Sequence, residues 1–266
     1  MVLPNFLIVG AQKCGTTSLF DILSHHPEVM MSKIKEVNYF TSEHKFNKGI
    51  NFYSTFFENP TDGQKLIGEA SPGYICTPGV PERIYHNLGV IKIVMIFRDP
   101  IKRAFSQYWD NRRHLSDPMS EEQIVKNYLE ETYDPLRKGY FSRGVYLPQL
   151  LKYEELFGKE NVHVLILEDL ISNQQYELKK LYQFLGVKKD FGLQLLPPAK
   201  NASYVWNNKL YNYFLKYPFL TTNIPKRMRR LFFFGKKKPF KYKLPQEKLM
   251  AELKLFYTDI RVNSGY

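Results

Sequence analysis

The feature that most constrains the fold is a glycine-containing loop that joins an apolar run to a helix-like segment near the start of the chain. The stretch reads Phe6-Leu7-Ile8-Val9-Gly10-Ala11-Gln12-Lys13-Cys14-Gly15-Thr16-Thr17-Ser18-Leu19. Its two glycines are five residues apart, and hydroxyl residues open the helix. In this layout, backbone N–H groups and a helix N-terminus converge on an anion. The stretch therefore predicts a phosphate-binding loop after the first strand of an α/β fold.

The lysine of this loop stands in an unusual place. In nucleoside triphosphatases a lysine follows the second glycine, where it reaches the β- and γ-phosphates. Here Thr16 has that position and Lys13 lies within the loop, where its side chain can hardly avoid the bound group. We therefore expect a phosphate-like ligand, but not ATP bound in the usual way. The alternative is a strand-to-helix turn whose glycines serve only tight packing.

Size and composition favour one globular domain. The chain has 266 residues, of which 44% are hydrophobic, enough for one substantial core. We expect a single domain over residues 1–266, with a core at about 4–190 and an aromatic, basic and helical region at about 197–266 that completes the donor and acceptor site.

The two cysteines and the hydropathy bear on location. Cys14 and Cys76 form neither a disulfide framework nor a zinc pattern, which favours a reducing compartment. There is no leader-like segment, and no apolar run approaches the length of about 18 residues expected of a membrane span. We therefore expect a cytoplasmic protein that neither is secreted nor crosses a membrane.

The positive charge is concentrated in one segment. The net charge is +12, and nine Lys and Arg residues lie between Lys226 and Lys243 with no acidic residue among them. A general nucleic-acid footprint would be spread over the fold. This local cluster predicts one local anionic target, and we expect no nucleic-acid partner.

Apolar periodicity predicts alternating strands and helices. After the first strand, we expect strands at Val29–Met31, Leu66–Ala70, Ile91–Phe97 and Val162–Leu167. We expect helices at Thr16–Ser24, Phe52–Phe57, Pro78–Leu88, Pro100–Arg113, Ser120–Thr132, Tyr146–Phe157, Tyr176–Leu185 and Gln246–Val262. The alternation predicts a P-loop-type, mostly parallel central sheet flanked by helices, with ligands at the carboxyl ends of the strands.

A second candidate site follows the most apolar strand, Ile91–Phe97. Asp99 is placed to cap the next helix and Pro100 to open it. Arg98 stands where ligands bind in such sheets, and its guanidinium suits bidentate phosphate binding, with Ser106 one helical segment further on. The alternative is a surface ion pair between Arg98 and Asp99 with a solvated serine, and position alone leaves both open.

A third candidate is Glu36, which lies between lysines and the aromatic pair Tyr39 and Phe40. The carboxylate could be a general base. It could also belong to a solvated charge cluster, which the residues alone favour, and the aromatic pair is more often core than ligand contact. His86, His114 and His163 have no spacing typical of a metal site, and we expect no metal.

These motifs together resemble a known family. The loop at Gly10–Thr17 is similar to the 5′-phosphosulfate loop of sulfotransferases that use 3′-phosphoadenosine-5′-phosphosulfate (PAPS). Ile96–Pro100 with Arg103, Ser106 and Tyr108 resembles their 3′-phosphate motif, and the similarity is greatest to the heparan-sulfate-type and bacterial branches. Other segments that resemble the family are Lys35–Phe40, Glu69–Tyr74, Val80–Ile84, Tyr146–Leu150 and Leu167–Leu170. The resemblance covers roughly residues 4–190.

The resemblance implies a PAPS-dependent transferase of class EC 2.8.2, with 3′,5′-adenosine diphosphate (PAP) as product and no metal. Lys13 would contact the bridging oxygen and the transferred sulfuryl group, and Glu36 would take the proton from the acceptor. The implied donor contacts are Gly10, Gln12, Lys13, Cys14, Gly15, Thr16, Thr17, Ser18, Arg98, Ser106, Tyr146 and, by a looser match, Lys236, Lys237 and Lys238. The implied acceptor contacts are Lys35, Asn38, Tyr39, Phe40, Ser71 and Tyr74.

The acceptor class is where the chain departs from its glycan-modifying relatives. Those enzymes carry a lysine beside the sulfuryl group where this chain has Ala70. We therefore expect transfer to a hydroxyl, less often an amine, of a small metabolite, as in natural-product tailoring, with a glycan as the alternative. A P-loop kinase would need the lysine after Gly15 that is missing here. A nucleic-acid or anionic-membrane module built on Lys226–Lys243 would leave both phosphate motifs unexplained.

Overall fold

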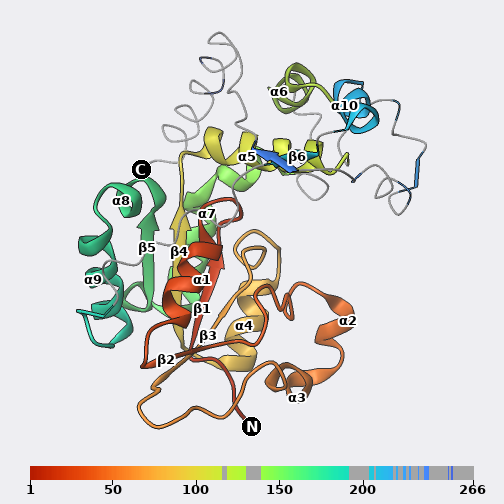
Figure 1. Cartoon of the computed structure of the whole chain (residues 1–266). Helices are drawn as coiled ribbons and strands as arrows, with labels where there is room; N and C mark the ends of the chain where they lie inside the picture. The colour runs from red at the N-terminus through yellow and green to blue at the C-terminus, as the bar shows by residue number, and fades with distance from the viewer. Residues whose placement is uncertain are drawn as a thin grey trace. The chain divides into compact units, whose positions relative to one another are not determined.

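The computed structural model describes residues 1–115, 119–129, 139–191, 204–206, 208–217, 220, 224–225, 228, 233, 237–239, 251 and 253. The chain forms two compact units, which are described separately (Figure 1). The first unit comprises Met1–Arg98 and Tyr146–Lys200, and the second comprises Asp99–Val145 and Asn201–Tyr266. The single functional domain expected over residues 1–266 stays a prediction.

The first unit is built on a five-stranded sheet in the order β2-β3-β1-β4-β5. Its strands are β1 (Phe6–Gly10), β2 (Val29–Met31), β3 (Leu66–Ala70), β4 (Lys92–Phe97) and β5 (Val162–Ile166). All four strand pairs are parallel. The prediction of an α/β fold with a central parallel sheet is confirmed, and its strand order brings the carboxyl ends of β1, β3 and β4 to one edge.

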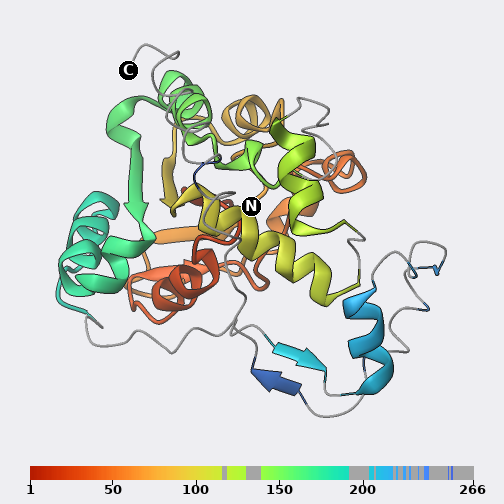
Figure 2. The same cartoon turned by 90° about the horizontal axis from the view of Figure 1, so that it is seen from above.

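Helices cover both faces of this sheet. They are α1 (Thr16–Ser24), α2 (Glu43–Phe46), α3 (Gly49–Ser54), α4 (Val80–Leu88), α7 (Tyr146–Phe157), α8 (Leu167–Ser172) and α9 (Gln174–Leu185). Helix α1 packs on β1, β2 and β3, whereas α7 packs on β4, β5 and α4 (Figure 2). The 3₁₀ turn η2 (Lys159–Asn161) leads into β5. Because both faces of the sheet are covered, the central strands β1 and β4 are largely apolar without alternation, which is typical of buried parallel strands.

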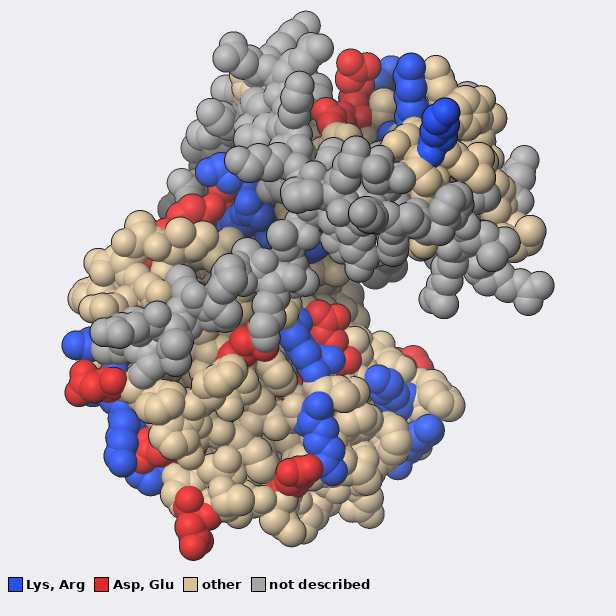
Figure 3. Space-filling model, in the orientation of Figure 1, with Lys and Arg blue, Asp and Glu red and all other residues tan. Residues whose placement is uncertain are grey.

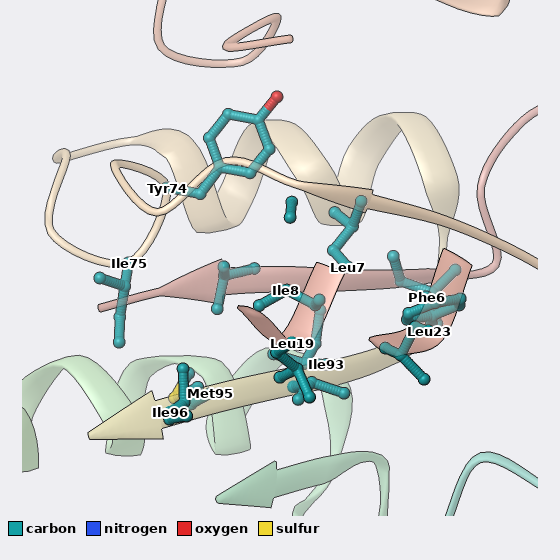
Figure 4. Packing of buried hydrophobic residues seen from close by; sticks show 14 of the residues in the cluster. Phe6, Leu7, Ile8, Leu19, Leu23, Tyr74, Ile75, Ile93, Met95 and Ile96 are labelled. Atoms are coloured by element: carbon teal, nitrogen blue, oxygen red, sulfur yellow. The ribbon is translucent and has the colours of Figure 1, made fainter. Parts of the chain in front are cut away.

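The core of the first unit lies around β1 and β4. Every residue of β1 is buried, and so are five of the six residues of β4. Leu19 and Leu23 of α1 pack onto the strands from one side, and Ile75 closes the end of β1 (Figure 4). The sheet edge that carries the predicted loops is therefore supported by a continuous apolar layer.

The second unit contains α5 (Pro100–Arg113), α6 (Glu121–Leu129), η1 (Ser142–Gly144), β6 (Tyr204–Trp206), α10 (Lys209–Lys216) and β7 (Lys237–Pro239). The strands β6 and β7 pair antiparallel. Phe105, Tyr108 and Phe141 belong to its apolar core. The Asp99 side chain accepts a hydrogen bond from the Lys102 amide, and Pro100 opens α5, so the predicted cap is confirmed.

Several predicted bounds change. The helix predicted at Phe52–Phe57 is α3, at Gly49–Ser54, and the chain continues in tighter i→i+3 turns that bury Tyr53 and Phe57 against the core. The strand predicted to include Leu167 ends at Ile166, because Leu167 opens α8 with acidic residues in its first turn. Helix α2 was not predicted. The helix predicted at Gln246–Val262 lies outside the described residues except for Ala251 and Leu253.

Charge and hydropathy add two observations. Basic and acidic side chains intermingle on the face of the first unit drawn in Figure 3. Most of the basic segment at Lys226–Lys243 lies outside the described residues. None of the described helices is long and apolar enough to cross a membrane.

Candidate functional site

The loop between β1 and α1 begins at a glycine that has no room for a side chain. A Cβ atom on Gly10 would lie 2.3 Å from Cγ2 of Ile75. The next amide, of Ala11, donates to the carbonyl oxygen of Ile96 at 2.8 Å and so ties the loop to β4. The close approach of the Ile75 segment explains the first glycine of the motif.

The rest of the loop turns through two left-handed residues. Lys13 has φ +69° and Gly15 has φ +95°, and a Cβ atom on Gly15 would lie 2.8 Å from Cδ1 of Leu167. Helix α1 starts directly after Gly15, and its first backbone bond runs from the Leu19 amide to the Gly15 carbonyl. The amides of Thr16, Thr17 and Ser18 precede that bond, so they form the positive end of the helix. Such a nest suits an anion.

Two residues far away in the sequence meet this loop. Arg98 follows β4, and its guanidinium donates to the Lys13 carbonyl in a long contact of 3.4 Å. Tyr146 opens α7; its ring stacks on Phe97 at 4.2 Å, and its hydroxyl donates to the Arg98 carbonyl at 3.0 Å. The same hydroxyl lies 3.6 Å from the sulfur of Cys14. The structure thus brings Lys13, Cys14, Arg98 and Tyr146 together, while Gln12 and Ser18 lie in the same loop and helix start.

The remaining predicted donor contacts belong to the second unit. Ser106 lies on α5 and is partly buried. Arg103, from the same motif, is fully buried, and its guanidinium donates to the side chain of Gln107 and to the Tyr140 carbonyl, which gives it a packing role. Lys236 lies outside the described residues, whereas Lys237 and Lys238 form part of β7. The donor contacts of Ser106 and of these lysines stay predictions.

The loop that carries Glu36 reaches the sheet edge next to β1. The Glu36 amide donates to the Ala70 carbonyl at 2.9 Å, and Ala70, the last residue of β3, pairs with Ile8 of β1. The Glu36 side chain is 50% exposed, and the ammonium of Lys35 lies 2.6 Å from its carboxylate. Glu36 has φ +63° and Asn38 has φ +54°, both left-handed. The loop therefore presents a carboxylate, already paired with a lysine, to solvent.

Four of the predicted acceptor contacts lie in the core. Tyr39, Phe40, Ser71 and Tyr74 are at most 1% exposed. The Ser71 hydroxyl accepts from the Asn38 amide and the Tyr74 hydroxyl from the Tyr39 amide, each at 2.9 Å. The ring of Tyr39 stacks on that of Tyr53 at 4.5 Å. These side chains hold the Glu36 loop from beneath, and only Lys35 and Asn38 of the predicted set reach the surface in part.

The sequence interpretation missed Glu69 as a residue with a role of its own. This carboxylate is fully buried at the end of β3 and accepts hydrogen bonds from Tyr53 at 2.6 Å, from Tyr74 at 3.0 Å and from Ser71. Burial raises the pKa of Glu69, and the three hydroxyl donors oppose that rise. An acidic residue inside the apolar run Leu66–Ala70 is the signal that could have revealed it, because a buried charge needs dedicated partners.

The arrangement offers an anion cradle, two cationic side chains and a partly exposed carboxylate at neighbouring positions of one sheet edge. Glu36 can accept a proton, and Lys13 and Arg98 can balance negative charge. Among the described residues, no group of three or more His, Cys, Asp or Glu side chains could hold a metal ion.

The family model described as "Sulfotransferase domain" matches residues 3–206. The chain is 30% identical over 197 residues to the membrane-associated sulfotransferase kil1 of Dictyostelium discoideum, covering 72% of this chain and 41% of that protein. It is 31% identical over 193 residues to human heparan sulfate glucosamine 3-O-sulfotransferase 5, covering 70% and 54% respectively. The chain therefore spans about half the length of these curated relatives.

Solved structures show the same fold. A sulfotransferase from Alicyclobacillus acidocaldarius superimposes with a TM-score of 0.63 at 28% identity, covering 86% of this chain and 94% of that one. Mouse sulfotransferase SULT7A1, solved in complex with PAP, superimposes with a TM-score of 0.55 at 15% identity, covering 96% and 84%. At that lower identity the similarity concerns the fold alone.

Proposed function

The chain belongs to the sulfotransferase domain family, and from this premise we propose that it transfers a sulfuryl group from PAPS to an acceptor hydroxyl and releases PAP. One observation carries the proposal. The loop with the internal Lys13 and the loop with Glu36 stand at the carboxyl ends of β1 and β3, which are neighbouring strands. A leaving phosphate and an accepted proton are the two charges that such a transfer must handle.

The loop fits the donor. Gly10 and Gly15 pack against Ile75 and Leu167, and this packing fixes the turn that leads into the N-terminus of α1. Thr16 and Thr17 at the start of α1 would hold the 5′-phosphate with their amides and hydroxyls. Arg98, whose guanidinium reaches the Lys13 carbonyl, would hold the 3′-phosphate, and the resemblance adds Ser106 to that contact.

The donor supplies a sulfuryl group activated by its bond to the 5′-phosphate. Glu36 accepts the proton of the acceptor hydroxyl while the acceptor oxygen bonds to sulfur. Lys13 stabilises the negative charge that develops on the bridging phosphate oxygen as the sulfur–oxygen bond breaks. Lys35, at 2.6 Å, keeps the Glu36 carboxylate in a fixed orientation. The transfer needs only these protein charges, the helix N-terminus and the two substrates.

We propose a small metabolite as the acceptor, with a glycan hydroxyl as the second candidate. Ala70 supports the first, since the resemblance places a lysine there in glycan enzymes and this position holds a fully buried methyl group. The named function of the human relative, a heparan sulfate glucosamine 3-O-sulfotransferase, favours the second. We also propose a cytoplasmic location, supported by the sequence, in which Cys14 and Cys76 form neither a disulfide framework nor a zinc pattern.

The test is product formation from PAPS with a panel of acceptors. The panel should contain hydroxylated small molecules, heparan-type oligosaccharides and matched amines, with PAP release and the mass of the acceptor as readouts. We expect PAP release with a sulfated hydroxyl product in the small-molecule arm. Products only in the oligosaccharide arm would move the acceptor to the glycan class, and an amine product would overturn O-transfer.

A further inference from the structure

The buried carboxylate of Glu69 lies beneath the Glu36 loop. It is the only charged residue of β3 (Leu66–Ala70), is fully buried, and has three hydroxyl donors. Tyr53 and Tyr74 donate to Oε2 at 2.6 Å and 3.0 Å, and Ser71 donates to Oε1. Three hydrogen-bond donors to one buried carboxylate indicate a specific structural role, because a buried carboxylate is tolerated only with such partners.

Two of the three hydroxyls also accept hydrogen bonds from backbone amides of the Glu36 loop. The Ser71 oxygen accepts the Asn38 amide and the Tyr74 oxygen accepts the Tyr39 amide, each at 2.9 Å. A hydroxyl has one proton to donate. Ser71 and Tyr74 direct theirs to Glu69, which leaves the lone pairs of both hydroxyl oxygens for the loop amides. Figure 4 shows the Tyr74 oxygen directed away from the labelled apolar side chains, as this relay requires.

The loop held in this way has an unusual backbone. Glu36 and Asn38 are both left-handed, a conformation that L-residues adopt only where their surroundings hold it. The Glu36 amide is fixed to the Ala70 carbonyl at 2.9 Å, and the Asn38 side chain donates to the Glu36 carbonyl at 3.0 Å. The relay secures the amides of Asn38 and Tyr39, so the loop is anchored on the carboxyl side of Glu36 as well.

We infer that Glu69 is a positioning residue: through Ser71 and Tyr74 it sets the hydrogen-bond direction that holds the Glu36 loop in its reactive conformation. The inference rests on the proposed function, in which Glu36 accepts the acceptor's proton. Glu69 itself is buried and does not touch the substrates. Glu69→Gln disturbs the relay because the amide brings a donor, so that one of the hydroxyls loses the acceptor for its proton.

Two tyrosines provide a matched pair of variants. Tyr53 and Tyr74 are both fully buried and donate to the same oxygen of Glu69. Within the described residues, the Tyr53 hydroxyl contacts Glu69 alone, whereas the Tyr74 hydroxyl also accepts the Tyr39 amide. A role in stability alone predicts similar effects of Tyr53→Phe and Tyr74→Phe. A positioning role predicts that only Tyr74→Phe disturbs the conformation of the Glu36 loop and lowers kcat.

The kinetic test separates kcat from donor binding. We expect Tyr74→Phe, Ser71→Ala and Glu69→Gln to lower kcat about 10- to 100-fold, the range typical of a small misplacement, with the KM for PAPS within about twofold. Tyr53→Phe should retain kcat, and Glu69→Asp should recover part of what Glu69→Gln loses. Equal kcat values for Tyr53→Phe and Tyr74→Phe would overturn the inference.

A double-mutant cycle with Glu36→Gln shows whether the effect passes through Glu36. If it does, Glu36→Gln/Tyr74→Phe should be no slower than Glu36→Gln alone, whereas independent roles would multiply the two losses. Multiplied losses would contradict positioning. The folding of each variant is checked by its melting temperature. If Glu69→Gln does not fold, Tyr74→Phe and Ser71→Ala still test the inference.

Amide hydrogen exchange tests the relay without activity. In Glu69→Gln and Tyr74→Phe, the Tyr39 amide should exchange faster, while the Ile75 amide, bonded to the Val9 carbonyl at 2.9 Å, should not change. Unchanged exchange at Tyr39 would overturn the relay. If Glu36→Gln had a normal rate, the role of Glu36 in the proposed function would fail, and exchange at Tyr39 would still report on the relay.

Discussion

The two loops at the active edge of the sheet are held by different kinds of interaction. The loop from Gly10 to Ser18 packs through its glycines, Gly10 against Ile75 and Gly15 against Leu167. The loop from Lys35 to Phe40 is held instead by hydrogen bonds to the side chains of Ser71 and Tyr74, which both donate to Glu69. Close packing around glycines therefore shapes the first loop, whereas buried side-chain hydrogen bonds hold the second.

The largest effect is expected from Glu36→Gln, which removes the proposed proton acceptor from the loop at Lys35–Phe40. We expect kcat to fall by about 10²- to 10⁴-fold, the usual contribution of a general base. PAP affinity should stay unchanged because the first loop is intact. Turnover of PAPS with the best acceptor of the panel measures the first effect, and titration with PAP measures the second.

Glu43→Gln is the matched control, since Glu43 of α2 is an exposed carboxylate paired with Arg83 of α4. Its turnover should equal that of the unmodified protein. If Glu36→Gln behaved like Glu43→Gln, the loop at Lys35–Phe40 would carry no catalytic carboxylate.

Lys13→Ala should act on the other loop. Removal of a charge placed against the developing phosphate charge is expected to lower kcat by about 10²- to 10³-fold. Lys179→Ala, which breaks only an exposed pair with Asp190, is the control for loss of a lysine. Melting temperatures should change little in either variant, and a normal rate for Lys13→Ala would contradict the assigned role.

Gly15→Ala tests whether the first loop depends on its backbone. The new Cβ would meet Leu167 at 2.8 Å, and the left-handed φ of +95° adds strain of about 1–2 kcal/mol. Gly63→Ala is a close control, with φ +92° and no atom within 4 Å of the new Cβ. Both variants should lose stability, and only Gly15→Ala should weaken PAP binding. Equal PAP affinities would show that the loop tolerates a changed backbone.

His163 gives the smallest effect and concerns neither loop. Burial lowers the pKa of His163, with a further contribution from Lys180, and its buried Nε2 has no hydrogen-bond partner among the described residues. The unfolded chain therefore takes up a proton at higher pH than the folded protein. The contribution of neutral His163 to the free energy of unfolding should be fully present above about pH 6.5. It should be lost as the pH drops through the lowered pKa, with a slope below about 1.4 kcal/mol per pH unit.

The control for this pH dependence is His163→Phe, which keeps an aromatic ring against Phe184 and cannot titrate. Denaturant midpoints at pH 8 and pH 5.5 should differ less in the variant than in the unmodified protein. An equal difference in both would assign the acid sensitivity to other groups.

Elements that depend on short-range sequence signals could be predicted from the sequence. The helix bounds Thr16–Ser24 and Pro100–Arg113 and the strand bounds Val29–Met31 and Leu66–Ala70 were predicted as observed. Gly186 follows α9 in the left-handed conformation that is typical of a glycine at a helix end. Each of these depends on short-range periodicity, caps or glycine, which the chain displays residue by residue.

What could not be predicted depends on tertiary contacts. The position of α3 follows from the burial of Tyr53 and Phe57, which no local pattern specifies. Tyr39, Phe40, Ser71 and Tyr74 looked like acceptor contacts beside Glu36, yet they lie in the core beneath it. Glu69 is the common partner of Tyr53, Ser71 and Tyr74, and its role becomes visible only when these residues, distant in sequence, converge on one carboxylate.

The most direct test of the central claim is a thermal-shift comparison of PAP with ATP plus Mg²⁺. A ligand that binds only the folded protein stabilises it by RT ln(1 + [L]/Kd), about 2.7 kcal/mol at one hundred times Kd. We predict a saturable rise of the melting temperature with PAP and none with ATP and Mg²⁺. A rise with ATP and Mg²⁺ alone, or no response to PAP at any concentration, would contradict the claim that this loop binds a sulfuryl donor.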